Sequence, residues 1–172
     1  MILKSFEINK INKKINQLIL FYGKNEGLKN EALNILIKDE NNIQNYEEKE
    51  ILDNENSFIE NILSKSLFEK EKFIVVKRTT DKILKVIETL HLKNLEDITI
   101  ILNSDNLEKK SKLRSLFEKD KKLVCVPFYP DNDQTLSKLA YNFLSNKKIS
   151  LSPSNNKFDN WQMQWRQRNS YK

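Results

Sequence analysis

Gly23 and Gly27 lie where a phosphate-binding loop would place its glycines, between an apolar segment and a segment of helical periodicity. Such a loop needs the pattern G-x-x-x-x-G-K-[ST]: backbone amides surround the phosphates, a lysine reaches them, and a hydroxyl holds Mg²⁺. Counting five residues on from Gly23 reaches Leu28-Lys29-Asn30, so the second glycine and the hydroxyl are both missing. The sequence favours a tight strand-to-helix turn, in which Gly23, Lys24 and Gly27 occupy a degenerate, non-functional phosphate-loop position.

The remaining residues that could carry chemistry are isolated from one another. The pair Lys77-Arg78 follows an apolar segment at a place where an acidic Mg²⁺ ligand would be wanted. The chain has one histidine, His91, and one cysteine, Cys125, which excludes a disulfide framework or a Cys-pair zinc site within the chain. We expect a surface or capping role for His91, a core position for Cys125 and a solvated acidic run at residues 47–50. No catalytic site, metal or cofactor is expected.

The charge balance is mildly basic. Thirty Lys and Arg against twenty-four Asp and Glu give a net charge of +6, but the two signs alternate along the chain. This predicts weak attraction to nucleic acid without a defined nucleic-acid-binding surface, and no aromatic stacking platform accompanies a basic groove. The longest apolar run, Leu18–Tyr22, is far too short for a membrane span, and the first residues lack the features of a signal peptide. A cytoplasmic protein is expected.

Hydrophobic periodicity predicts an α/β fold. Four short apolar runs indicate buried strands, at residues 18–22, 73–76, 98–102 and 123–126. Helical spacing alternates with them, at residues 26–36, 57–68, 83–92, 109–119 and 135–144. Asn25 and Asp81 are placed as N-caps, and residues 38–56 read as a loop containing a weak edge strand. Such alternation predicts a parallel sheet with helices on both faces.

Ser66-Leu67-Phe68 forms a notable group at the end of the helix predicted for residues 57–68. Adjacent residues of a helix cannot both point toward the face that carries Phe58 and Ile62, so at least one of Leu67 and Phe68 projects elsewhere. Periodicity leaves two interpretations open: core packing at the helix end, or an exposed apolar pair that anchors a partner protein.

Several segments, in order, carry a resemblance to a known family: residues 20–28, 66–68, 73–76, 107–114 and 125–129. Together they resemble the delta subunit of the bacterial DNA polymerase III clamp loader, over roughly residues 2–153. The resemblance implies an AAA+-like (P-loop NTPase-like) domain, here residues 1–148, that has lost its nucleotide site. It also implies that Leu67 and Phe68 bind the sliding clamp and help to open it during replication.

The same resemblance implies the partners. The sliding clamp is met directly, DNA only indirectly through the loader complex, and no membrane is involved. ATP hydrolysis would come from other loader subunits, within a DNA-directed DNA polymerase (nucleotidyltransferase) holoenzyme. Residues 149–172 would begin the lid region, and the collar domain that assembles the loader is absent, which puts contact with the other subunits in doubt. The alternatives are a divergent P-loop-like nucleotide-binding enzyme and a small basic nucleic-acid-binding domain.

Composition changes near Asn155, and no apolar periodicity continues beyond it. Trp165-Arg166 read one base later must encode glycine, because Trp is always TGG and every Arg codon begins with A or C. One choice of codons gives Gly-Asp-Arg, which resembles the lid of the delta family at this place. Our hypothesis is that residues 155–172 are a frameshifted tail, which would be disordered because it lacks an apolar face.

Overall fold

The computed structural model describes residues 1–38, 43–64, 71–93, 95–132 and 136. Contacts between Cα atoms divide the chain into two units, Met1–Pro130 and Asp131–Lys172, of which the first contains all the elements described below. The strands are β1 (Leu18–Tyr22), β2 (Ile43–Glu47), β3 (Lys72–Lys77), β4 (Ile98–Ser104) and β5 (Val124–Pro127). The helices are η1 (Ser5–Lys10), α1 (Glu26–Ile37), α2 (Glu48–Asp53), α3 (Glu55–Leu63), η2 (Asp81–Ile83), α4 (Leu84–His91) and α5 (Lys112–Lys119).

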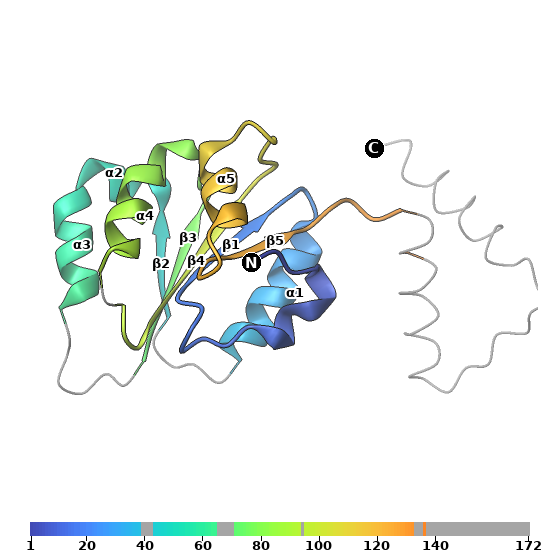
Figure 1. The fold of residues 1–172 in the computed structure, drawn as a ribbon, viewed down its shortest axis with the longest axis horizontal. Helices are drawn as coiled ribbons and strands as arrows, with labels where there is room; N and C mark the ends of the chain where they lie inside the picture. The colour runs from blue at the N-terminus through green and yellow to red at the C-terminus, as the bar shows by residue number, and fades with distance from the viewer. Residues whose placement is uncertain (39–42, 65–70, 94, 133–135, 137–172) are drawn as a thin grey trace, which may run out of the picture. The chain divides into compact units, whose positions relative to one another are not determined.

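The five strands form one parallel sheet in the order β2-β3-β4-β1-β5 (Figure 1). The four apolar runs are confirmed as strands: three of them form the inner strands β3, β4 and β1, and the fourth forms the edge strand β5. The predicted weak edge strand is confirmed as β2. The loop predicted for residues 38–56 is wrong beyond that strand, because α2 and the start of α3 lie there. Only Ile51 of α2 is a buried apolar residue, which is too little for hydrophobic periodicity to reveal the helix.

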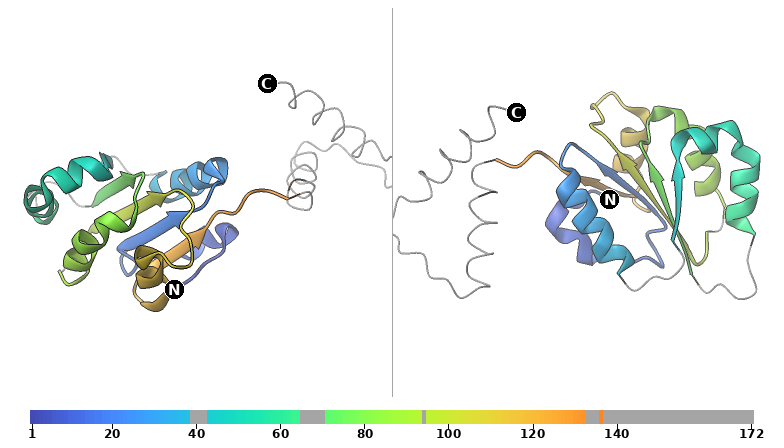
Figure 2. Two further views of the ribbon diagram at one scale, coloured as in Figure 1. Left: turned by 90° about the horizontal axis from the view of Figure 1, so that it is seen from above. Right: turned by 180° about the vertical axis from the view of Figure 1, so that it is seen from behind.

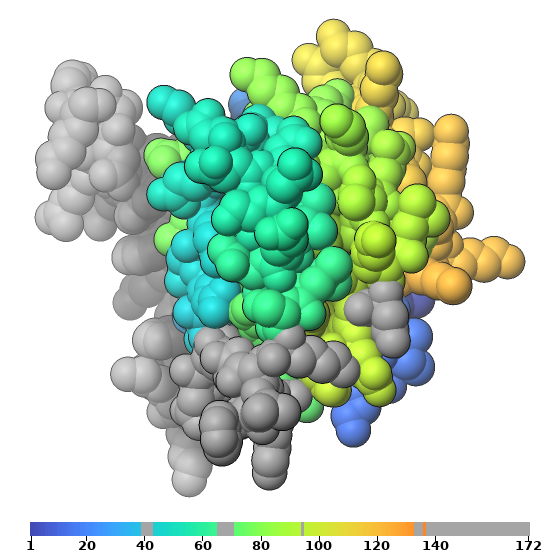
Figure 3. All heavy atoms as spheres, turned by 90° about the vertical axis from the view of Figure 1, so that its left-hand side faces the viewer, coloured from blue at the N-terminus to red at the C-terminus, as the bar shows by residue number. Residues whose placement is uncertain are grey.

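Both faces of the sheet are covered, which explains the continuous apolar runs. Alternate side chains of β1 enter two different cores: Leu18, Leu20 and Tyr22 join one, Ile19 and Phe21 the other. The first core is completed by α2 to α5, and the second by α1 and η1. Figure 2 shows α1 and the N-terminal segment on one side of the sheet, and Figure 3 shows α3 beside α4 on the other.

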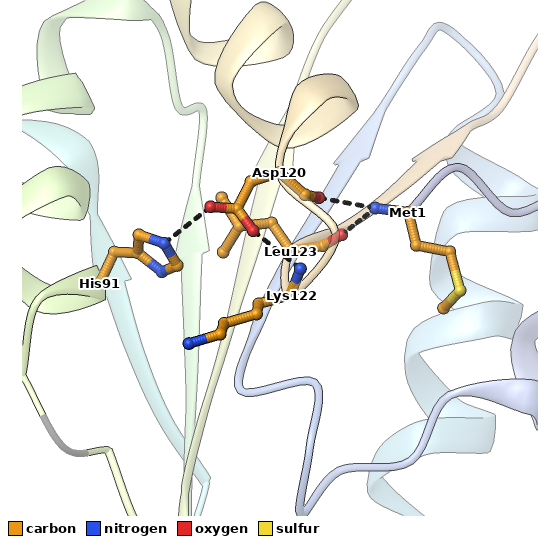
Figure 4. Close-up of polar contacts among 5 residues, drawn as sticks. All are labelled: Met1, His91, Asp120, Lys122 and Leu123. Carbon is orange, nitrogen blue, oxygen red and sulfur yellow. Dashed lines mark hydrogen bonds and ion pairs between the residues drawn. The ribbon is translucent and has the colours of Figure 1, made fainter.

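The N-terminal residues close the outer edge of β5. The Leu3 amide donates to the Cys125 carbonyl, and the Cys125 amide donates to the Met1 carbonyl, both at 2.9 Å. The α-ammonium group of Met1 donates to the Asp120 carbonyl at 2.9 Å and also to the Leu123 carbonyl (Figure 4). This edge strand would otherwise present unpaired backbone groups.

The core position expected for Cys125 is confirmed, whereas His91 is half-buried and pairs with another side chain instead of lying on the surface or capping a helix. His91 ends α4, and its Nε2 lies 2.9 Å from Asp120 Oδ2, at the end of α5 (Figure 4). Hydrogen bonding from the Lys122 amide and from His91 holds the pKa of Asp120 below its usual value. Cys125 is fully buried in β5, and burial raises the pKa of its thiol to about 12. His91 thus links α4 to the end of α5, and Cys125 fills part of the core.

Asp81 has a different role from the predicted one. Thr80, not Asp81, caps η2, while the Asp81 carboxylate accepts hydrogen bonds from the Ser111 hydroxyl and the amides of Lys112 and Leu113. It therefore holds the N-terminus of α5, whose N-cap is Ser111. Burial alone would raise the pKa of Asp81, but these hydrogen bonds outweigh it and hold the pKa below its usual value.

We expect Asp81→Ala to lower the free energy of unfolding at neutral pH by about 1 kcal/mol, as for the loss of a helix cap. Because the pKa is lowered by folding, the charged carboxylate stabilises the fold above its unfolded pKa and loses this effect as the pH falls through the folded pKa. Urea unfolding of both proteins should therefore show a difference at pH 7 that shrinks below about pH 4. Asp53→Ala, at an exposed site in α2, is the control; an equal loss there, or a pH-independent difference at Asp81, would contradict this role.

Candidate functional site

The carboxyl edge of a parallel sheet is where α/β proteins bind ligands, and here the turn between β1 and α1 lies at that edge. Gly23 has φ of +127°, and a Cβ added there would come 2.1 Å from the Phe128 carbonyl oxygen. A residue other than glycine cannot fit. A Cβ at Gly27 would meet only the Asn25 side chain, at an ordinary 3.6 Å. Gly23 is therefore needed because the backbone at Phe128, just after β5, comes very close to it. The space beside Gly23 is filled by this backbone and is not open to a phosphate.

Several backbone amides of this turn donate within the protein. The amide of Gly23 donates to the Asp105 carbonyl at 3.1 Å, and that of Asn25 donates to the Phe128 carbonyl at 3.3 Å. The amide of Leu28 donates to Asn25 Oδ1 at 3.1 Å, which confirms Asn25 as the N-cap of α1. A phosphate would have to break these bonds before it could use the same donors.

Lys29 occupies the place of the lysine that would reach the phosphates, but its side chain points inward. It is 1% exposed, and its ammonium group donates to the Ser104 carbonyl at the end of β4 at 2.9 Å. The same nitrogen lies 2.5 Å from Glu26 Oε1, one turn earlier on α1. A buried ammonium is stable only when paired and hydrogen-bonded, and Lys29 is both. The cation is therefore committed to holding α1 against β4.

Further polar groups complete the same edge above β3 and β4. The hydroxyls of Thr79 and Ser104, both buried, are hydrogen-bonded at 2.5 Å. The carboxylate of Glu48 accepts from the amide and hydroxyl of Thr80 at 2.6 to 3.0 Å. Glu48 is only 8% exposed, so the expectation of a solvated surface for residues 47–50 is wrong at this position. The hydrogen bonds between Glu48 and Thr80 therefore link α2 to the segment after β3.

The segment after β3 does not supply a metal ligand. Arg78, with φ of 55°, stands where an acid would be wanted, and its Nε donates to Glu47 Oε2 at 2.7 Å. Within the part of the chain that the structure describes, no group of three or more His, Cys, Asp or Glu is arranged to hold a metal ion.

A cation–π pair, Arg114 and Tyr22, lies at the carboxyl end of β1. The Arg114 guanidinium lies 4.8 Å from the centre of the Tyr22 ring, and its Nε donates to Glu118 at 2.7 Å. Burial, followed by a hydrogen bond with Tyr129, raises the pKa of the Tyr22 hydroxyl. Sequence reasoning missed Arg114, Glu48 and the inward direction of Lys29, since each depends on a partner from a distant element.

The structure describes only some of the residues that the sequence predicted for the site. The structure puts Gly23, Lys24 and Gly27 on the turn just described, with Lys24 exposed. Leu67 and Phe68, the predicted clamp-binding pair, lie outside the described residues, as do the helix predicted at residues 135–144 (apart from residue 136) and the tail. Among the described residues, no helix is long and apolar enough to span a membrane.

We expect a calorimetric titration of the protein with Mg-ATP to show no binding, because Lys29 and the amides of Gly23, Asn25 and Leu28 are engaged within the protein. Saturable binding of micromolar affinity, lost on Lys29→Met or Lys24→Ala, would contradict this expectation and favour a divergent nucleotide-binding enzyme.

We also expect Lys29→Met to lower the free energy of unfolding by about 1–3 kcal/mol, because the buried Ser104 carbonyl loses its donor while the side-chain length is kept. Lys24→Met, which changes an exposed lysine of the same turn, is the matched control and should stay within about 0.5 kcal/mol of the unchanged protein. Denaturant unfolding measures both. Equal stabilities of the two variants would mean that Lys29 does not hold α1 against β4.

Neither a scan against protein-family models nor a search of curated proteins finds a match. Among solved structures, the fold is similar to the DNA clamp loader delta protein of Bacillus subtilis, with a TM-score of 0.62 and 14% sequence identity. The similarity covers 83% of this chain and 48% of that protein, so the chain spans about half the length of the protein it matches. The similarity is one of fold: an α/β fold with a five-stranded parallel sheet and flanking helices.

Proposed function

We propose that this chain is a clamp-binding protein of the clamp loader delta kind, which binds a sliding clamp and does not hydrolyse ATP. The observation that carries the proposal is the combination of a delta-like fold with a carboxyl edge closed by the chain's own groups. A nucleotide-binding enzyme would need that edge open. A protein that binds its partner elsewhere has no need of an open carboxyl edge, and a closed edge makes its fold stable.

The flanks of the proposed anchor support this role. The helix α3 ends at Leu63, and its C-cap Ser64 has an extended backbone while its amide donates to the Glu60 carbonyl at 2.8 Å. On the far side, the Lys72 amide donates to the Asp97 carbonyl, and Lys72 Nζ donates to the Asn61 carbonyl at 2.9 Å. Both ends of residues 65–70 are therefore attached to the rigid sheet and to α3. The described residues on either side of the proposed anchor thus have fixed positions in the fold.

The core beneath α3 is consistent with an anchor that is free for a partner. Phe58 and Ile62 are buried against the sheet, and the Phe58 ring meets the Tyr46 ring of β2 edge-on, with centroids 5.0 Å apart. The inward positions of α3 are thus filled by described residues. Under the proposal, Leu67 and Phe68 are additional to this core.

The mechanism is mechanical. A clamp whose ring interface can open exists in closed and open states, and a protein that binds the open state more tightly shifts the population toward it. In the proposal, the binding free energy of Leu67 and Phe68 in an apolar pocket of the clamp supplies that preference. ATP hydrolysis would belong to partner subunits, and any contact with them is part of the proposal.

We expect the double change Leu67→Ala/Phe68→Ala to weaken clamp binding by about 2–4 kcal/mol, the usual range for truncating a hot spot. Under the proposal the pair binds the clamp and is no part of the core, so the thermal stability should stay nearly unchanged. Calorimetry with a purified bacterial sliding clamp and a thermal melt measure the two quantities on the same preparations.

Two variants calibrate the result. Phe6→Ala/Ile35→Ala removes apolar residues that are 77% and 46% exposed on η1 and α1, and it should leave both quantities unchanged. Ile62→Ala should cost about 2–5 kcal/mol of stability as a core truncation. A Leu67/Phe68 variant that behaves like Ile62→Ala, without a specific loss of binding, would refute the anchor.

A further inference from the structure

A hollow of about 690 Å³ lies at the amino edge of the sheet, away from the closed carboxyl edge. Its lining comes from the segments that lead into three neighbouring strands. These segments are residues 9–14 and 17 before β1, Glu71 before β3, and residues 96, 97 and 99 at the start of β4. We call this hollow the amino-edge pocket.

Thr99, part of the pocket lining, carries a buried hydroxyl group without a partner. The residue is 4% exposed, and no hydrogen bond to its hydroxyl is found among the described residues. Each of the other buried polar side chains that the structure describes makes a hydrogen bond. A buried hydroxyl that lacks a partner costs free energy. The exception at Thr99 therefore points to a hydrogen-bonding group from outside the chain.

The side chain of Thr99 lies on the face of the sheet that carries the pocket. Side chains alternate along β4: Ile100 belongs to the first core and Ile101 to the second, so Thr99 shares the face of Ile101. Ile11, which lines the pocket, belongs to the second core as well. The Gln17 carbonyl accepts from the Ile100 amide at 2.7 Å, which fixes the segment before β1 beside the start of β4.

The charges of the lining balance one another. Three lysines and three acids contribute to it: Lys10, Lys13, Lys14, Glu71, Glu96 and Asp97. All the lysines lie on the segment before β1, and all the acids lie on the segments before β3 and β4. A ligand held between these segments therefore meets both signs of charge, and the lining as a whole favours neither an anion nor a cation.

Only some of these charges are engaged within the protein. Lys10 pairs with Glu7 at 2.6 Å, and Lys13 donates to the Leu36 carbonyl at 3.4 Å. The charged groups of the lining that have no ion pair among the described residues are Lys14, Glu71 and Asp97. One cation and two carboxylates are thus available to a ligand.

We propose that the amino-edge pocket binds a small polar zwitterion of the free amino acid kind. Its ammonium group would pair with the carboxylates of Glu71 and Asp97, and its carboxylate with Lys14. The Thr99 hydroxyl would gain the hydrogen bond that it lacks. No aromatic side chain lines the pocket within the described residues, so it offers no stacking platform for a nucleobase. The proposal is independent of the proposed clamp binding.

An NMR titration of the ¹⁵N-labelled protein tests the proposal, with L-glutamine as the probe. We expect saturable shifts of the amides in residues 9–17 and 96–100, with a dissociation constant below about 1 mM. Two analogues of glutamine each lack one charge: 4-carbamoylbutanoate lacks the ammonium group, and 4-aminobutanamide lacks the carboxylate. Each should bind about tenfold more weakly, because one set of charge-assisted hydrogen bonds is lost.

The variant Thr99→Val keeps the shape of the side chain and removes the hydroxyl. It should weaken glutamine binding about tenfold, yet leave the thermal midpoint of the ligand-free protein unchanged or raise it, because no hydrogen bond within the protein is lost. The matched control is Thr79→Val, which removes a buried hydroxyl that is bonded to Ser104 at the carboxyl edge. It should lower the thermal midpoint and keep the affinity for glutamine within about twofold.

A second variant tests the charge at an exposed site, where folding is not at risk. Lys14→Gln should weaken glutamine binding about tenfold, whereas Lys24→Gln, at an exposed lysine of the carboxyl edge, should not change it.

Four results would overturn the proposal. The absence of saturable shifts would mean that the hollow holds only water, and shifts confined to other residues would place the ligand elsewhere. Equal affinity for either analogue would exclude the recognition of a zwitterion. A thermal midpoint lowered by Thr99→Val as much as by Thr79→Val would mean that the Thr99 hydroxyl already has a partner in the fold.

Discussion

The ion pair and hydrogen bond of one buried lysine organise the carboxyl edge of the sheet. At that edge the parallel strands end in carbonyl groups, and α1 begins with amides that need acceptors. Lys29 donates to the Ser104 carbonyl at the end of β4 and pairs with Glu26 on its own helix. In a nucleotide-binding protein of similar architecture a bound phosphate would meet such a lysine. Here the protein's own carbonyl takes that place.

The neighbouring contacts support this arrangement. Gly23 allows the Phe128 backbone to come close, and the Phe128 carbonyl in turn accepts the amide of Asn25. The hydroxyl of Ser104, whose carbonyl accepts from Lys29, is hydrogen-bonded to Thr79. Because each of these groups has a partner in the chain, the edge is stable without a ligand.

The fold could largely be predicted from the sequence, because the strands of a doubly covered parallel sheet are continuous apolar runs. The misses have particular causes. The short helix α2 buries one apolar side chain, and the only buried residue of the 3-10 helix η1 is Ile8. Neither helix therefore shows the apolar periodicity by which a helix is predicted from sequence. Asp81 was assigned to the wrong helix because its partners come from Ser111, Lys112 and Leu113, thirty or more residues later.

The candidate site was less predictable. The absence of a working phosphate loop follows from the residues after Gly23, but the direction of Lys29 depends on Ser104, 75 residues away. The assignment of Leu67 and Phe68 comes from a family resemblance, and periodicity alone leaves it open.

The most direct measurement of the central claim is an NMR spectrum of the lysine ammonium groups, recorded on protein labelled with ¹⁵N in lysine. A buried ammonium held by a carbonyl and a carboxylate exchanges its protons slowly, whereas exposed lysines exchange too fast to be seen. The account predicts a protected signal that disappears in Lys29→Met and does not move when Mg-ATP is added. A Lys29 signal that is absent, or that shifts saturably with Mg-ATP, would show that the edge is open to a ligand and would contradict the account.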